Sequence, residues 1–197
     1  MEEIKQETKE ILRIDTAAGL EPKKLLEPLP VYNDKLPALM LKSLPFDFAT
    51  PQIDPEELAL RLTVTMKMYG GIGLSAVQCN ILLRVFSLYC DENIVCFNPT
   101  ILGLTDETSY DKEGCLSFPG IYLSIRRPVG VKLEWYDKKG ERHEGEFSGL
   151  TARAIIHEMD HLEGILFTKY VGSVTMQLAK KRRKKMIKRI ERQRVRK

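Results

Sequence analysis

The segment His157–His161, with the sequence HEMDH, has the clearest chemical potential in this chain. On a helix, residues four apart lie one above the other, so two imidazoles at this spacing can bind one metal ion. Glu158, beside the first histidine, is then close enough to take a proton from a water on that metal. A solvated helix face with two incidental histidines is the alternative interpretation. Only three histidines occur in the chain, and two of them lie here.

A third ligand decides the class of metal site, because catalytic sites commonly have three protein ligands and one open position. Metalloproteases with the pattern HExxHxxGxxH carry a third histidine on the same run, but Phe167 occupies that position here and excludes this class. In another class, a glutamate on a following helix completes the site. The only acid after Glu163 is Glu191, within a run of lysines and arginines, which disfavours that class. We therefore expect the third ligand upstream.

The upstream segment Glu113–Ser117, EGCLS, offers Cys115 as that ligand. It has the composition of a turn between two strands, where Gly114 lets the backbone approach closely and the amide after the cysteine can point at a ligand. Together with His157 and His161, the thiolate would leave the fourth position to water. An ordinary buried thiol is the alternative. We give that second interpretation to the cysteines without a motif around them: Cys79, Cys90 and Cys96.

Three segments, in this order, resemble the signature motifs of peptide deformylases: Gly71–Gln78 (GIGLSAVQ), Glu113–Ser117 (EGCLS) and His157–Gly164 (HEMDHLEG). The resemblance runs from about residue 28 to residue 172. Cys115–Tyr122 is similar to the type 1B branch of plant organelles and many bacteria. The resemblance implies a metal-dependent hydrolase that removes the N-formyl group from the N-terminal methionine of nascent polypeptides and releases formate.

The same resemblance implies a role for each motif residue. Cys115, His157 and His161 would bind one divalent ion, natively iron(II), with zinc or nickel found after purification; sulfur and imidazole ligands suit all three metals. Glu158 would move the proton from the attacking water to the departing amine. The charged oxygen would be stabilised by two donors, the Gln78 side-chain amide and the Leu116 backbone N–H.

The residues expected to border the substrate follow from position alone. A linear methionine side chain needs an apolar slot, and Ile72, Leu150 and Ala154 are candidates for its wall. Gly73 resembles the family glycine that lets the substrate backbone lie close to a strand edge, and Gly114 is a further substrate-binding candidate because it lets the backbone approach closely. Ser75 stands where the family commonly has alanine, a small change that we expect to be tolerated.

The elements that must carry these residues predict an α+β fold, with antiparallel strands packed around a central helix that bears the metal ligands. Asp54-Pro55-Glu56-Glu57 supplies an N-cap and a first turn, so a helix should begin there and end at Gly70-Gly71. A second helix is expected from about Leu150 to Glu163, ended by Gly164. Short β-rich runs lie between the helices, the last two forming a hairpin: Leu82–Leu88, Ile94–Phe97, Ile101–Leu104, Ile121–Ile125, Val129–Tyr136 and Arg142–Phe147.

Length and composition agree with one compact catalytic domain. The 197 residues are 43% hydrophobic and 29% charged, which excludes a disordered or fibrous protein. We expect an N-terminal extension of uncertain structure over 1–27, the deformylase-like domain over 28–172 and a basic helical tail over 173–197. Four sparse cysteines and no signal peptide predict free thiols in the cytoplasm. No apolar run approaches the roughly 18 residues of a membrane helix, so we expect no membrane partner.

Charge is distributed unevenly along the chain. Residues 1–179 hold 19 basic and 26 acidic side chains, a net charge of −7, whereas Lys180–Lys197 holds 12 basic residues and one acid, a net charge of +11. The family resemblance implies that this tail is a helix that contacts ribosomal RNA, as in many bacterial deformylases, and phosphate contacts would make such binding salt-dependent. A solvated helix and a nuclear localisation signal share this composition.

Two other functions remain open from the sequence. One is a related metal-dependent amide hydrolase that acts on a different acyl substrate. The other is a non-catalytic ribosome-binding or RNA-binding protein whose metal is structural. Glu158 and Gln78 argue against the second, because a structural metal site needs neither residue.

Overall fold

The computed structural model describes residues 27–90 and 92–194, so the predicted N-terminal extension lies almost entirely outside the described residues. A run of antiparallel strands lies between helices along the chain, and the predicted α+β class is confirmed. Three short 3-10 helices connect the larger elements: η1 (Pro37–Met40), η2 (Ala76–Cys79) and η3 (Phe167–Tyr170).

The first long helix, α2 (Pro55–Met68), begins and ends where the sequence predicts. The Asp54 side chain accepts a hydrogen bond from the Glu57 N–H at 2.8 Å, which satisfies one of the free donors at a helix start. Gly70, with φ of 66°, follows the last turn and reverses the chain direction. The buried face of α2 packs on the edge of the main sheet through apolar side chains: Leu58, Leu62 and Met66.

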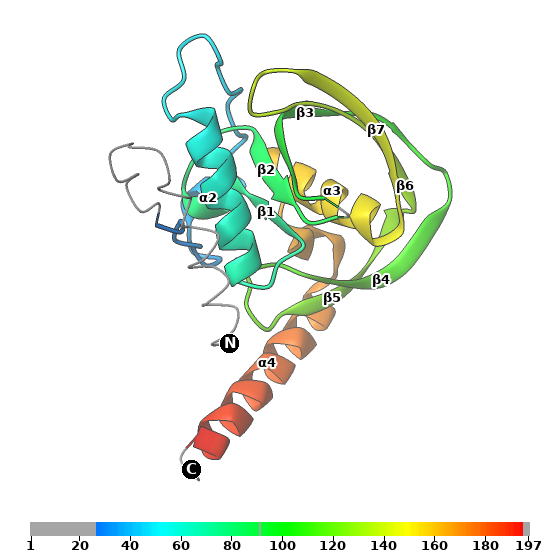
Figure 1. Cartoon of the computed structure of the whole chain (residues 1–197). Coiled ribbons are helices and arrows are strands. Elements are labelled where there is room, and N and C mark those ends of the chain that lie inside the picture. Colours follow the sequence, from blue (N-terminus) through cyan, green and yellow to red (C-terminus); the bar gives the residue numbers. More distant parts are fainter. Residues whose placement is uncertain (1–26, 91, 195–197) are drawn as a thin grey trace.

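Seven strands form two separate antiparallel sheets (Figure 1). The larger sheet has the strand order β1-β2-β3-β6-β7, and its strands are β1 (Gly73–Ser75), β2 (Val85–Leu88), β3 (Ile94–Leu104), β6 (Gly130–Tyr136) and β7 (Arg142–Ser148). The smaller sheet pairs β4 (Thr108–Gly114) with β5 (Tyr122–Pro128). The turn between these two strands carries the cysteine of the EGCLS motif.

Several strands differ from their predicted extents. The runs Ile94–Phe97 and Ile101–Leu104 form one strand, β3, because register shifts after Phe97 absorb the interruption at Asn98, whose φ is 48°. The sequence did not predict β1 or β4. The predicted hairpin across residues 137–140 is confirmed as the β6–β7 pair.

The helix α3 (Gly149–Leu162) carries both histidines of the HEMDH segment. Its apolar residues pack against β2, β3 and β6, including Ile155, Ile156 and Leu162. Gly164, with φ of 70°, follows its C-terminus. A Cβ atom there would lie 2.8 Å from the backbone of Met40, so only glycine allows η1 to pass this close to the end of α3.

The basic C-terminal segment forms a single helix, α4 (Ser173–Arg194), which projects from the rest of the molecule (Figure 1). Its first turns belong to the core, because Ala179 is buried in a cluster with Phe118, Ile121 and Phe167. Further along, Met186 contacts Gly120 in the β4–β5 turn. None of the helices in residues 27–90 and 92–194 is long and apolar enough to cross a bilayer.

Candidate active site

The three motifs meet at one cavity of about 540 Å³. Its lining comes from the segment leading into β1, the β4–β5 turn and the first turns of α3. Ten of the eleven predicted site residues line this cavity or lie at its base, as three groups: Ile72, Gly73 and Gln78; Gly114, Cys115 and Leu116; Leu150, Ala154, His157 and Glu158. The eleventh, His161, lies beside Cys115. Residues far apart in the sequence therefore share one site.

Cys115, His157 and His161 form a compact group of possible metal ligands. One ligand atom from each lies within 4.8 Å of the others, and Cys115 Sγ is 3.2 Å from His161 Nε2. All three side chains are at least nine-tenths buried. Sulfur and imidazole nitrogen in this arrangement fit a first-row divalent ion, with room left for a fourth ligand on the cavity side. The residues present therefore fit the metal that the sequence implies.

The Glu113 carboxylate orients His157, the first histidine of the HEMDH segment. Its Oε2 accepts a hydrogen bond from His157 Nδ1 at 3.2 Å, which leaves His157 Nε2 to face the metal site. Burial raises the pKa of Glu113, but hydrogen bonds from His157 and Arg127 outweigh it and lower the pKa to about 2. Glu113 is therefore ionised at neutral pH and fixes the tautomer of His157.

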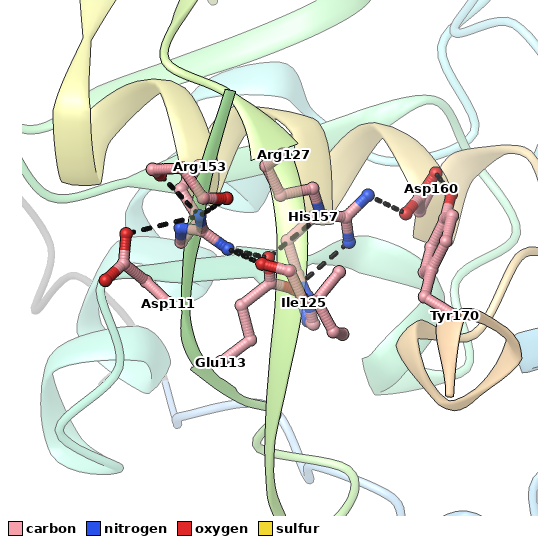
Figure 2. A network of polar contacts seen from close by, with 9 residues as sticks. Asp111, Glu113, Ile125, Arg127, Arg153, His157, Asp160 and Tyr170 are labelled. Atoms are coloured by element: carbon pink, nitrogen blue, oxygen red, sulfur yellow. Dashed lines mark hydrogen bonds and ion pairs between the residues drawn. The ribbon is translucent and has the colours of Figure 1, made fainter. Parts of the chain in front are cut away.

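Two buried arginines surround Glu113 and complete a network that the sequence analysis missed (Figure 2). Arg127 donates to both carboxylate oxygens of Glu113, at 2.9 and 3.0 Å, and at 2.7 Å to Asp160, the residue before the second histidine. Arg153 donates to Glu113 at 2.8 Å. The Tyr170 ring covers the Arg127 guanidinium at 4.5 Å. The network ties both histidines of α3 to the smaller sheet.

One sequence signal could have identified Arg127. Leu123, Ile125 and Arg127 alternate along β5, so their side chains share a face of the strand. A charged side chain on an otherwise apolar strand face needs a buried partner, and here that partner is Glu113. The identity of the partner depends on the strand register and could not be read from the sequence.

The carboxylate of Glu158 is buried at the cavity base between α3 and β1. Burial raises its pKa. Its Oε2 accepts a hydrogen bond from Ser75 Oγ at 2.7 Å. A Cβ atom at Gly73 would lie 2.9 Å from Glu158 Cδ, so glycine at that position makes room for the carboxylate. Gly73, which we predicted to contact substrate, thus also contacts Glu158.

The Gln78 side chain is oriented by its own loop. Its Oε1 accepts from the Ser75 backbone N–H at 2.9 Å, so its amide NH₂ group points the other way. That group lies 3.2 Å from Ser117 Oγ and 3.5 Å from Cys115 Sγ. A hydrogen-bond donor therefore faces the metal ligands, with Leu116 as the next residue along the cavity wall.

The substrate-binding candidates divide between the mouth and the interior of the cavity. Ile72 and Leu150 are 40% and 64% exposed, whereas Ala154 is buried. The ring of Tyr122 packs against Gly114, and a Cβ atom at Gly114 would lie 2.8 Å from that ring. The close approach that we expected at Gly114 is thus made by an aromatic ring of the paired strand.

Comparison with known proteins agrees with this geometry. The family model described as polypeptide deformylase matches residues 28–177. The chain belongs to the peptide deformylase family. A peptide deformylase of Acinetobacter baumannii is 36% identical over 171 residues, which cover 85% of this chain and 96% of that protein. One from Cytophaga hutchinsonii is 32% identical, covering 79% and 88% of the two chains.

Solved deformylase structures share the fold. A class I type b peptide deformylase of A. baumannii, crystallised with Met-Ala-Ser bound, has a TM-score of 0.69 at 29% identity and covers 74% of this chain and 99% of its own. Peptide deformylase 1B of Arabidopsis thaliana, in complex with an inhibitor, has a TM-score of 0.72 at 30% identity, covering 84% and 93%. The predicted family and activity are confirmed: the chain is a deformylase-type hydrolase that removes the N-formyl group of nascent polypeptides.

Proposed function

We propose that this deformylase hydrolyses formylmethionyl peptides with a divalent ion held by Cys115, His157 and His161. The observation that carries the proposal is the grouping of one sulfur and two imidazoles within 4.8 Å at the base of a cavity. Glu158, buried and adjacent to the first histidine, supplies the acid–base group that such a reaction needs. In this proposal the catalytic domain spans residues 28–172, and the basic helical tail spans residues 173–197.

The metal is proposed to be iron(II) in the native protein, with zinc or nickel as replacements after purification. When bound, the ion supplies a Lewis acid that activates water and polarises the formyl oxygen. The family is metal-dependent, and the mixed sulfur and nitrogen donors suit each of these metals. The choice of iron rests on the family resemblance, and metal analysis of protein purified without oxygen tests it.

Glu158 moves the proton in the proposed reaction. Its carboxylate takes a proton from the attacking water as the water oxygen bonds to the formyl carbon. The carbon–nitrogen bond then breaks, and Glu158 gives the proton to the departing amine, so that formate and a free N-terminus are the products. A carboxylate whose pKa is raised by burial suits both directions of this transfer.

Gln78 and the Leu116 N–H are the proposed donors to the oxygen that gains negative charge. The Gln78 amide is preorganised, because its oxygen is held by the Ser75 N–H and its nitrogen points to Cys115. Preorganised donors need little rearrangement during reaction, and removing one typically costs about 2.7–4 kcal/mol of barrier.

The peptide is proposed to enter along the cavity mouth. The methionine side chain would contact Ile72, Leu150 and Ala154, and the backbone after it would add as a strand near Gly71–Leu74 or Gly120–Tyr122. Main-chain hydrogen bonds of this kind give affinity with little dependence on sequence, which suits an enzyme that processes many nascent chains.

Formate release from a formyl-Met-Ala-Ser peptide tests the proposed function. The protein is purified anaerobically, its metal content is recorded, and the Glu158→Ala variant is assayed beside it. We expect rapid release by the wild type, and in the variant a loss of about a hundredfold or more in kcat with the metal retained. Metal-loaded wild type that releases no formate would favour an amide hydrolase with another acyl substrate. Loss of metal from the variant would contradict the role of Glu158.

We further propose that α4 contacts ribosomal RNA. Its side chains from Lys180 to Arg192 are mostly basic and exposed, which suits phosphate recognition. Residues 195–197, the end of the predicted contact segment, lie outside the described residues. The cytoplasm, where formylated chains emerge in bacteria, is the setting that we propose.

A further inference from the structure

Ser75 contacts two residues of the site, Glu158 and Gln78, but does not itself line the cavity. Its backbone N–H donates to Gln78 Oε1 at 2.9 Å, and its hydroxyl lies 2.7 Å from Glu158 Oε2. The residue is fully buried. From the sequence we expected this serine to be a tolerated small change from alanine, yet it is in direct contact with the proposed proton carrier.

The hydroxyl has one strong acceptor. Ser75 Oγ is 2.7 Å from the carboxylate oxygen of Glu158 and 3.2 Å from the Glu158 main-chain oxygen. A hydroxyl carries a single proton, so the shorter, charge-assisted bond to the carboxylate is the stronger of the two. Such a bond fixes the rotation of the carboxylate about its terminal torsion, which is otherwise broad.

The carboxylate is held from a second direction by the start of the same strand. The Cα of Gly73 packs against the Glu158 side chain so closely that a Cβ atom would lie 2.9 Å from both Cγ and Cδ. Gly73 and Ser75 lie on the same face of β1, because alternate residues of a strand point the same way. One strand thus supplies a steric contact and a hydrogen bond to one carboxylate.

We infer that Ser75 is a positioning residue, whose hydroxyl holds the Glu158 carboxylate in the orientation needed for proton transfer. The inference rests on the proposed function of Glu158. Ser75 does not line the cavity, and its hydroxyl donates to Glu158 while accepting from the Gln78 backbone N–H at the start of η2. It therefore acts on the chemical step rather than on binding.

The Ser75→Ala variant isolates this contact. The substitution removes the hydroxyl, including its contact with the Gln78 backbone N–H, but keeps the Ser75 backbone N–H that holds Gln78 Oε1. We expect kcat for formyl-Met-Ala-Ser to fall about tenfold or more, as for loss of a hydrogen bond to a charged group, while KM stays within about twofold. Metal content should equal that of the wild type, because the ligands are untouched.

Ser87→Ala is the matched control. Ser87 is equally buried on β2, next to β1, and its hydroxyl bonds to Thr63 at 3.1 Å, away from Glu158. Both variants lose one buried hydroxyl, so both should lose some stability, but only Ser75→Ala should lose kcat. Ser75→Cys adds a graded test, because its weak S–H donor should give a kcat between those of serine and alanine.

Each outcome decides the inference. An unchanged kcat in Ser75→Ala, an equal fall in Ser87→Ala, or loss of metal from Ser75→Ala would overturn it. Should Ser75→Ala fail to fold, Ser75→Cys with wild-type kcat would overturn it as well. If the wild type releases no formate, the proposed function itself is wrong. If the wild type is active and Ser75→Ala has the same kcat, only the inference about Ser75 is wrong.

Discussion

Glu158 shows how much a single side chain in this site depends on its immediate neighbours. The residue belongs to α3, but the groups that surround its carboxylate come from β1, which precedes it by more than eighty positions. The HEMDH spacing predicts that the glutamate is near a metal, because that relation is local to one helix. Its contact with Ser75 arises only when strand and helix pack.

The contact between Gly73 and Glu158 predicts a strong effect of one methyl group. In Gly73→Ala the new Cβ would meet the Glu158 side chain at 2.9 Å, so the carboxylate must shift. A displacement of about 1 Å at a reacting group can cost about a hundredfold in rate, and we expect a fall in kcat of that order. Steady-state formate release measures it.

Gly103→Ala is the control for Gly73→Ala. A Cβ atom at Gly103, in β3, would have Lys132 Cβ as its nearest neighbour at 4.0 Å, which is ordinary contact. This variant should keep the wild-type kcat. Equal activity of the two variants would show that the close packing on Glu158 is not needed for turnover.

At the scale of elements, the smaller sheet supports the proposed metal site. The β4–β5 turn carries Cys115, and the two strands supply Glu113 and Arg127, which hold His157 and Asp160 of α3 (Figure 2). Ligands from a turn and a helix are therefore fixed to each other by buried ion pairs as well as by apolar contacts.

Removing the charge of Glu113 tests this support. In Glu113→Gln, the buried Arg127 would keep only the Asp160 carboxylate and Arg153 only that of Asp111, and breaking a buried ion pair typically costs about 3–5 kcal/mol of unfolding free energy. The folded-state pKa of Glu113, about 2, is below its ordinary value of 4.5. Its contribution to stability is thus fully present above pH 4.5 and is lost as the pH falls towards 2.

Urea unfolding of wild type and Glu113→Gln between pH 7 and pH 3 measures both effects. The glutamine does not titrate, so the difference in unfolding free energy between the two proteins should be largest above pH 4.5 and should narrow below it. A difference that stays constant down to pH 3 would mean that the carboxylate is not stabilised in its charged form.

The elements that the sequence predicted are those with local signals. Asp54 and Pro55 define the start of α2, and an apolar spacing defines α3. The strand β4 was missed because only Glu113 of its seven residues is buried, so no alternation of apolar side chains marks it. The grouping of Cys115, His157 and His161, the proposed metal ligands, was predictable from residue type and spacing. The network of Glu113, Arg127 and Arg153 was not, because their pairing depends on the β4–β5 register.

For the whole molecule, α4 combines attachment to the core with an exposed basic surface. Ala179 is buried beside the β4–β5 turn, and Met186 and Arg183 lie against Gly120 in the same turn. The turn also lines the cavity. A ribosome-binding test therefore needs substitutions on the exposed side of α4 rather than removal of the helix.

Neutralising four exposed basic residues of α4 tests the proposed contact with ribosomal RNA: Lys184, Lys185, Lys188 and Arg192, each changed to Gln. Each lost phosphate contact reduces the slope of log Kobs against the logarithm of the salt concentration by about 1. The four substitutions together should therefore reduce this slope by up to about 4. Binding to isolated ribosomes at several salt concentrations measures the slope. Lys35→Gln with Lys139→Gln, exposed lysines outside α4, is the control; an unchanged slope in the α4 variant would leave α4 a solvated helix.

The origin of the ligands in two different elements has a thermodynamic consequence. Cys115 and His161 are separated by 46 positions, so an ion bound to both cross-links the smaller sheet to α3 only in the folded chain. A ligand at a thousand times its Kd stabilises the folded state by about 4 kcal/mol, or roughly 8–16 °C in Tm at this size. Chelation should lower the Tm by that amount, and Cys115→Ser should abolish the difference. The ion would then be a reversible cross-link whose loss weakens the fold as well as the reaction.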